Sequence, residues 1–127
     1  MMAAAGDVRR VLRSFGFAGA GIVTLLHTQP NARVHLALGA GAASLAVWLG
    51  LSSLECAVLV LTVGLVLVAE AVNTAIEATV DLASPAIHPL AQRAKDVAAG
   101  AVLLSAVTAV LVGLALFGPR VVMLVSR

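Results

Sequence analysis

Three long apolar runs divide the chain, and they contain almost no charge. Acids occur only in the second half of the second run; the runs cover residues 36–54, 56–82 and 97–117. At ~1.5 Å per residue, a helix over each run is long enough to cross a hydrocarbon core of ~30 Å. Membrane strands alternate apolar and polar residues, whereas these runs are apolar on all sides and rich in Ala and Leu. The pattern predicts spanning helices at about 32–51, 54–82 and 91–117.

The segment before the first run, from about residue 7 to residue 28, has a mixed pattern. Its apolar side chains recur roughly on one side of a helix, and its arginines lie elsewhere; the two sets are Val8, Leu12, Phe15, Ile22 and Leu26, and Arg9, Arg10 and Arg13. This spacing predicts an amphipathic helix that lies in the membrane interface. Contact between the arginines and anionic lipid headgroups also explains their presence without any further role.

Composition agrees with a membrane protein. Of the 127 residues, 61% are hydrophobic and only 11% are charged, which is far from the balance of a soluble domain. We therefore expect a single membrane-embedded domain of all-α fold over residues 1–127, with short connections. A separate soluble domain and a nucleic-acid partner are not expected.

Positive charges predict the orientation, because Lys and Arg are enriched in cytoplasmic loops. They precede the first and third predicted spans and are missing from the GLSS link between the first two; they are Arg9, Arg10, Arg13, Arg33, Arg93 and Lys95. The N-terminus and the loop at 84–96 are therefore expected in the cytoplasm. Arg120 and Arg127 fall on the outer side and oppose this assignment.

The second run ends in EAVNTAIEATVD, which places polar residues on one helix face. At ~100° per residue, Glu70, Asn73, Glu77 and Asp81 share a sector of roughly 80°. If the span enters at Cys56, Glu70 lies about 21 Å along it and Glu77 about 32 Å, near the cytoplasmic interface. Such a stripe can place a base beside a lipid hydroxyl and a shallower carboxylate beside a hard cation and its phosphates.

Spacing alone leaves several interpretations of this stripe open. Ionisable groups inside a membrane indicate function by default, but the stripe also fits interhelical hydrogen bonding or a path for protons or cations. Lys95, at the start of the third span, can pair with a phosphate or neutralise Asp81 or Asp96. Because three spans cannot enclose the stripe on every side, we expect an oligomer.

A resemblance to a known family narrows these interpretations. EAVNTAIEATVD followed by HPLAQRAKDVAAGAVLL resembles the signature of the small prokaryotic membrane kinases of diacylglycerol and undecaprenol. RSFGFAGAGI and NARVHL are similar to further segments of that family, so the resemblance extends over nearly the whole chain. The HPLA and RVHL motifs are closer to those of the undecaprenol kinase branch of the family.

The resemblance implies a homotrimer in the prokaryotic plasma membrane, with composite sites between subunits. It implies transfer of the γ-phosphoryl group of Mg-ATP to a lipid hydroxyl, with undecaprenol favoured over diacylglycerol. Glu70 would be the general base with Asn73 beside it, and Glu77 would hold Mg²⁺. The remaining nucleotide-side positions would be Arg10, Asp81, His88, Lys95 and Asp96. The alternative is a proton- or cation-conducting trimer, or a weakened or inactive relative, that uses the same stripe.

Two positions depart from the family pattern. Gln29 stands where the family usually has a metal-binding glutamate, and a neutral amide binds Mg²⁺ more weakly than a carboxylate. Phe17 stands where the family often has Tyr, which removes a hydroxyl from the expected nucleotide pocket. Both are nevertheless expected to line the nucleotide site, with Gln29 also at the metal. His35 matches a family histidine, but a structural or interfacial role is expected and no chemistry is assigned to it.

Overall fold

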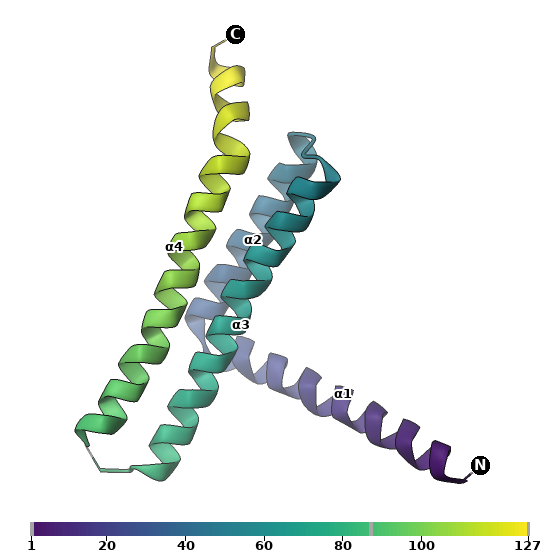
Figure 1. The fold of residues 1–127 in the computed structure, drawn as a ribbon, viewed down its shortest axis with the longest axis vertical. Coiled ribbons are helices and arrows are strands. Elements are labelled where there is room, and N and C mark those ends of the chain that lie inside the picture. Colours follow the sequence, from purple (N-terminus) through teal and green to yellow (C-terminus); the bar gives the residue numbers. More distant parts are fainter. Residues whose placement is uncertain (1, 87, 127) are drawn as a thin grey trace.

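The computed structural model describes residues 2–86 and 88–126, which form four helices and their connections (Figure 1). The helices are α1 (Met2–Thr28), α2 (Pro30–Trp48), α3 (Ser53–Ala83) and α4 (Pro89–Val125). No strand occurs within these described ranges, which confirms the all-α prediction. Arg127, which entered the orientation argument, lies outside the described residues.

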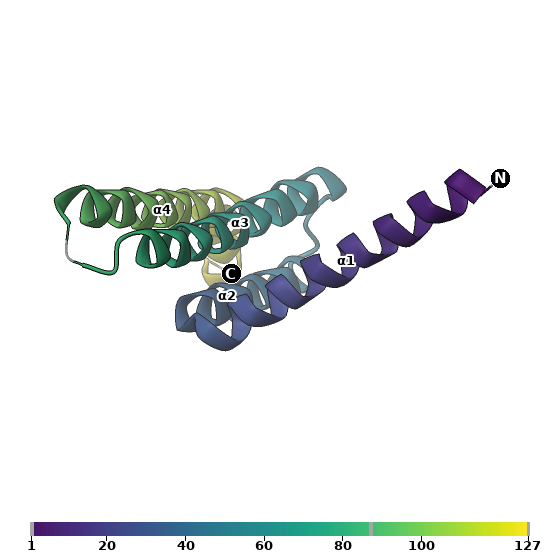
Figure 2. The ribbon, with the colours of Figure 1, turned by 90° about the horizontal axis from the view of Figure 1, so that it is seen from below.

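Helices α2, α3 and α4 run up, down and up beside one another (Figure 1). Helix α3 lies at the centre of this bundle, because it packs against both α4 and α2. Helix α1 leaves the bundle at the start of α2 and extends away from it as a single rod, as both views show (Figures 1 and 2). The N-terminal part of α1 is therefore remote from the end of α3 and the start of α4 (Figure 1).

Local sequence explains the turns between the helices. Gly50 has φ +64°, a left-handed conformation that glycine adopts without steric cost. Ser52 then caps α3: its hydroxyl accepts a hydrogen bond from the Glu55 backbone N–H, and the Glu55 carboxylate accepts one from the Ser52 N–H. This reciprocal capping box fixes where α3 begins. Helix α4 starts at Pro89, in the first helical position, where the missing N–H costs no hydrogen bond.

The contact between α2 and α3 depends on small residues. Ala32 and Ala46 are buried on α2. A methyl group added at Gly39 would lie only 2.6 Å from Cγ1 of Val63. The backbone of α2 therefore lies close to the Val63 side chain of α3 at this level, as small residues allow in membrane helix pairs. Many large apolar side chains elsewhere on the helices are exposed, including Leu104, Val110, Leu111 and Leu114 of α4. Surface of this kind fits contact with lipid or with other subunits.

Three segments of the described chain are both long enough and apolar enough to cross a membrane: Arg9–Thr28 within α1, Ser53–Ala83 and Pro89–Val125. This differs from the sequence-based assignment, which gave the first span to residues 32–51 and placed residues 7–28 in the interface. The physical reason is that α2 ends at Trp48 and begins with the polar residues Asn31, Arg33 and His35. By composition, α1 is the better candidate for the first spanning helix. By packing, α2 is the better candidate, because it belongs to the bundle.

Helix α4 continues beyond the predicted end of the third span. It passes through Pro119 and ends at Val125 instead of at Phe117. A proline within a helix removes one backbone hydrogen bond. In the same turn, the Arg120 guanidinium donates a hydrogen bond to the Leu116 carbonyl over 2.9 Å. This side-chain hydrogen bond lies next to the place where the proline removes a backbone hydrogen bond.

Candidate functional site

The four polar residues of the predicted stripe all lie on α3, and their burial decreases toward its C-terminal end. Glu70 is only 2% exposed and Asn73 is 9% exposed. Glu77 is half-buried and Asp81 is exposed. The stripe therefore joins a carboxylate that water barely reaches to one that is solvated.

Two buried oxygen atoms in the stripe lack hydrogen-bond partners. They are Oε1 of Glu70 and Oδ1 of Asn73. The Asn73 amide instead uses its Nδ2 to donate to Oε1 of Glu77 over 3.1 Å. Buried polar atoms in folded proteins are nearly always paired, so each exception calls for an explanation. Two such acceptors lie one helical turn apart on the same face of α3.

His35 of α2 reaches the deep end of the stripe. Its Nε2 lies 3.3 Å from Oε1 of Glu70, although the pair lacks hydrogen-bond geometry. Sequence analysis assigned this histidine no chemistry, and the structure places it beside the proposed base. Its position three residues from Ala32 and four from Gly39 was a usable signal, because i, i+3 and i+7 residues share one helix face.

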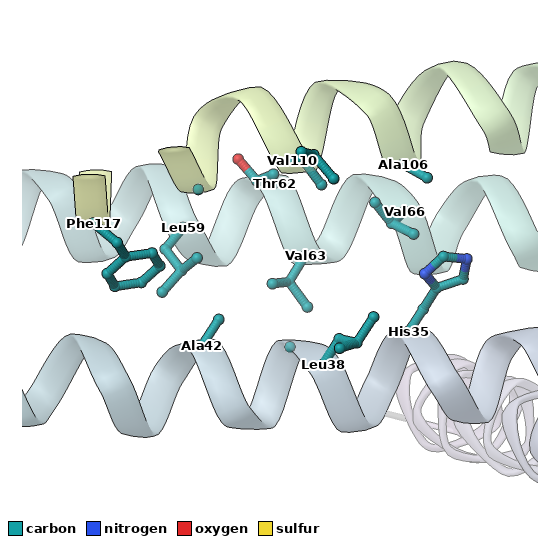
Figure 3. Close-up of a pocket in the computed structure, with 13 residues that line it drawn as sticks. His35, Leu38, Ala42, Leu59, Thr62, Val63, Val66, Ala106, Val110 and Phe117 are labelled. Carbon is teal, nitrogen blue, oxygen red and sulfur yellow. The ribbon is translucent and has the colours of Figure 1, made fainter. Parts of the chain in front are cut away.

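An apolar groove opens beside this contact, between α2, α3 and α4 (Figure 3). Its volume is about 260 Å³. His35 lies at one end of the groove and Phe117 at the other, with Val63, Val66 and Val110 between them (Figure 3). The groove is thus an apolar channel that leads to the imidazole in contact with Glu70.

The end of α3 and the start of α4 bring together a second group of predicted residues. Lys95 Nζ lies 2.8 Å from Oδ1 of Asp81, in an ion pair. The Gln92 amide donates to Oδ1 of Asp96, also over 2.8 Å. Asp81, His88 and Lys95 share a shallow pocket of about 170 Å³ with the helix connection. Of the alternatives left open for Lys95, the structure shows the pairing with Asp81.

His88 has a structural role at the start of α4. It is the N-cap of α4, and its Nδ1 accepts a hydrogen bond of 3.2 Å from the Leu90 N–H. Satisfying an orphan donor at a helix start is a structural task. The other ring nitrogen of His88 remains available to a ligand in the shared pocket.

Three predicted residues are not joined to the stripe within the described chain. Arg10 and Phe17 lie on α1, where they line a separate surface hollow with Arg13 and Ser14. Gln29 forms the N-cap of α2, but its side chain makes no capping hydrogen bond. No hydrogen bond or ion pair among the described residues links these three to α3. Within a single copy, the described polar contacts therefore do not join them to Glu70 or Glu77.

A metal ion would not find a complete set of ligands in one chain. Across residues 2–86 and 88–126, no group of three or more His, Cys, Asp or Glu side chains is placed to hold one. Mg²⁺, however, is usually held by one or two carboxylates together with substrate phosphates and water. Glu77 and the unpaired Oδ1 of Asn73 supply oxygen donors of that kind, so this part of the stripe fits the ion.

The opposite end of α3 carries an ion pair that sequence analysis missed. Arg120 donates from Nη1 to Oε1 of Glu55 and from Nη2 to Oε2, each over 2.9 Å. The pair neutralises the charge of Arg120, which weakens its weight against the orientation expected from the sequence. Glu55 precedes the second apolar run and Arg120 follows the third, and this placement at the ends of adjacent runs was the available signal.

Comparison with known proteins identifies the relatives of this chain. The family model described as prokaryotic diacylglycerol kinase matches residues 16–117. A diacylglycerol kinase of Synechocystis is 46% identical over 104 residues, which cover 81% of this chain and 59% of that protein. The undecaprenol kinase of Bacillus subtilis is 39% identical over 114 residues, which cover 90% of this chain and 93% of that protein. The diacylglycerol kinase of Escherichia coli is 30% identical over 102 residues, covering 80% and 84%.

The matched region includes the central bundle, the buried stripe and the pocket at the start of α4. The residues aligned with each relative span 59% of the Synechocystis protein but nearly all of the Bacillus subtilis one. The expected resemblance is confirmed, and the chain belongs to the prokaryotic diacylglycerol kinase family, a family of membrane lipid kinases.

Proposed function

We propose that the protein transfers the γ-phosphoryl group of Mg-ATP to the hydroxyl group of a membrane lipid, with undecaprenol favoured over diacylglycerol. The observation that carries this proposal is the buried carboxylate of Glu70, which has no hydrogen bond to Oε1 and lies 3.3 Å from the imidazole of His35 at the end of an apolar groove. A carboxylate in this setting is suited to accept the proton of a lipid hydroxyl. The groove suits the apolar chain of such a lipid, whose hydroxyl would then face the carboxylate.

The remaining stripe residues support phosphoryl transfer. As Glu70 accepts the hydroxyl proton, the lipid oxygen bonds to the γ-phosphorus, and the bond to the β,γ-bridging oxygen breaks to release ADP. Asn73 orients the neighbouring groups through its amide, which already donates to Glu77. Glu77 and Asn73 Oδ1 would hold Mg²⁺, which offsets phosphate charge when bound. Protein catalysis of this reaction consists mainly of alignment and charge stabilisation.

Lys95 and Asp96 supply the nucleotide side of this proposal. The Lys95 ammonium is held by Asp81, in a partly open pocket where an incoming phosphate can compete for it. Asp96 is held by Gln92 on the same helix. This cation distinguishes the kinase from a proton or cation path, which has no clear use for a lysine at its mouth.

The detached position of α1 supports a composite site in a homotrimer. Helices α2 to α4 form the bundle, and we propose that they span the membrane with the N-terminus in the cytoplasm while α1 lies along its surface. The arginines of α1 are exposed, and α1 extends beyond its own bundle (Figure 2). Arg10 and Phe17 of one copy would then complete the nucleotide site of a neighbour. Gln29, the N-cap of α2, would also face the metal.

The test uses purified protein in lipid with labelled ATP and Mg²⁺, supplied separately with undecaprenol and with diacylglycerol. We expect transfer to at least one lipid, and faster transfer to undecaprenol. Replacing Lys95 with Met should raise the KM for ATP and leave the KM for lipid unchanged. Absence of transfer to either lipid would contradict the kinase proposal. A membrane current carried by the protein in liposomes, with no transfer, would favour the conduction alternative.

A further inference from the structure

His35 is the residue of the site whose role the proposed function leaves unassigned. Its imidazole crosses from α2 to α3, and its Nε2 lies 3.3 Å from Oε1 of Glu70. That oxygen is buried and has no hydrogen bond in the described structure. The imidazole is therefore the polar group available to the buried end of the carboxylate.

The groove beside this contact is lined by few polar side chains. Of the residues that line it, only His35 and Thr62 have polar side chains, and the Thr62 hydroxyl donates to the Val58 carbonyl over 2.8 Å. His35 thus offers the free polar atoms on the groove wall. A lipid chain lying in the groove would place its hydroxyl end beside an imidazole and a carboxylate that already touch.

The packing of α2 holds the imidazole in place. Ala32 and Gly39 share the His35 face of the helix, at three residues before it and four residues after it. Ala32 is fully buried, and Gly39 approaches Val63 so closely that a methyl group there would clash. These small residues bring α2 near enough to α3 for the ring of His35 to reach Glu70. The contact is thus built into the helix pair and does not arise from a loose surface side chain.

We propose that His35 is a positioning residue that orients the Glu70 carboxylate for the lipid hydroxyl. With a proton on Nε2, the ring can donate to Oε1 after a small rotation and leave the other carboxylate oxygen to accept the hydroxyl proton. Hydrogen bonds of catalytic groups are often long or misaligned without substrate and shorten in the complex. This inference rests on the proposed lipid kinase function and adds to it a residue that orients the general base, Glu70.

The first test compares two replacements of His35 with a matched change elsewhere. His35→Phe keeps a ring but removes the donor, and we expect kcat to fall by about 10- to 100-fold while both KM values stay close to wild type. His35→Gln keeps an N–H donor and should recover most of the lost kcat. His27→Phe makes the same change at an exposed histidine outside the site and should retain wild-type kinetics. Wild-type kcat in His35→Phe, or equal loss in His35→Gln and His35→Phe, would overturn the positioning role.

The second test does not depend on activity. In protein labelled with ¹⁵N at histidine, Glu70→Gln should shift the imidazole resonances of His35 and leave those of His27 and His88 in place. An unchanged His35 spectrum would overturn the proposed contact, whatever the kinetics show. If the wild-type protein phosphorylated no lipid while the His35 resonances still responded to Glu70→Gln, the kinase proposal would fail and the contact would be structural.

Discussion

Glu55 and Glu70 are acids of the same helix, but their surroundings are opposite. Both oxygens of Glu55 accept from Arg120, and one also accepts from the Ser52 N–H and hydroxyl over 2.8 and 2.7 Å. Glu70 is more deeply buried, yet its Oε1 has no hydrogen bond and only a misaligned histidine nearby. The chain thus satisfies the acid in the first turn of α3 and leaves the buried one without a hydrogen bond to Oε1.

This difference distinguishes a charged group that stabilises the fold from one that the proposed function would use. Both groups lie among apolar helices. A carboxylate that is fully paired ties elements together, as Glu55 ties the start of α3 to the late turns of α4. A buried carboxylate without a partner lowers stability, because its hydration is lost and not replaced. Such a cost persists where function requires the group. Replacing each acid in turn should therefore change stability in opposite directions.

The largest expected effect is on activity at Glu70. Glu70→Gln should reduce phosphoryl transfer by about 10³-fold, the scale expected for loss of a general base. Glu70→Leu should lose activity as well but raise the free energy of unfolding by about 1–3 kcal/mol, because an unsatisfied polar group is removed. Kinase assays and thermal unfolding in detergent measure the two effects. Full activity in Glu70→Gln would remove the base assignment, and destabilisation by Glu70→Leu would remove the contrast with Glu55.

The next effect is on stability at Arg120. Arg120→Leu should lower the midpoint of thermal unfolding by several degrees, because Glu55 loses both guanidinium hydrogen bonds and the Leu116 carbonyl loses its donor. Transfer by the folded protein should not change, since this pair lies far along α3 from the stripe. Removing both charges, with Arg120→Leu and Glu55→Leu together, should recover part of the loss. A strictly additive loss in the double variant would show that the pair is not coupled.

The sequence could predict the helices and the stripe for clear reasons. Runs of apolar residues have few ways to satisfy their backbone in a membrane, so they form helices. Residues of one helix are placed by its period, which is why Glu70, Asn73, Glu77 and Asp81 could be assigned to one face. The burial gradient along α3 follows the order that the depth estimate gave.

Contacts between helices could not be predicted in the same way. Helix period says which residues share a face, but it does not say which neighbour that face meets. His35 was therefore left without chemistry, and the Glu55 pairing with Arg120 was missed. Hydropathy also cannot decide between α1 and α2 as a spanning helix, because α2 gains its place through close packing at Gly39 and its apolar run is short. The proposed catalytic roles and the trimer remain predictions.

Gly39 tests whether helix spacing maintains the surroundings of Glu70. Gly39→Ala would place a methyl group 2.6 Å from Cγ1 of Val63, so α2 or the Val63 side chain must shift, at a cost of about 1–3 kcal/mol for overpacking. We expect a smaller fall in kcat than for His35→Phe, because His35 moves but is retained. Gly41→Ala is the matched control, since a methyl group there meets nothing within 4 Å.

A second replacement distinguishes spacing from a general loss of stability. Adding Val63→Ala to Gly39→Ala makes room for the new methyl group and should restore part of both stability and kcat. Equal effects of Gly39→Ala and Gly41→Ala would show that close approach at this level is unimportant. Restored stability without restored kcat would show that the distance between His35 and Glu70 does not depend on this contact.

Gln29 should give the smallest effect, and it extends the comparison to the junction of α1 and α2. Like Glu70, it has a side chain that the fold does not use, because it caps α2 without a side-chain hydrogen bond. Gln29→Glu adds a negative charge at a helix N-terminus, which the helix tolerates well. If the residue faces the metal, the Mg²⁺ concentration for half-maximal transfer should fall by about 2- to 5-fold, since a carboxylate is the better ligand. Gln29→Leu, which removes the oxygen, should raise it. The same Mg²⁺ dependence in all three proteins would place Gln29 outside the metal site and leave Glu77 and Asn73, on the stripe itself, to hold the ion.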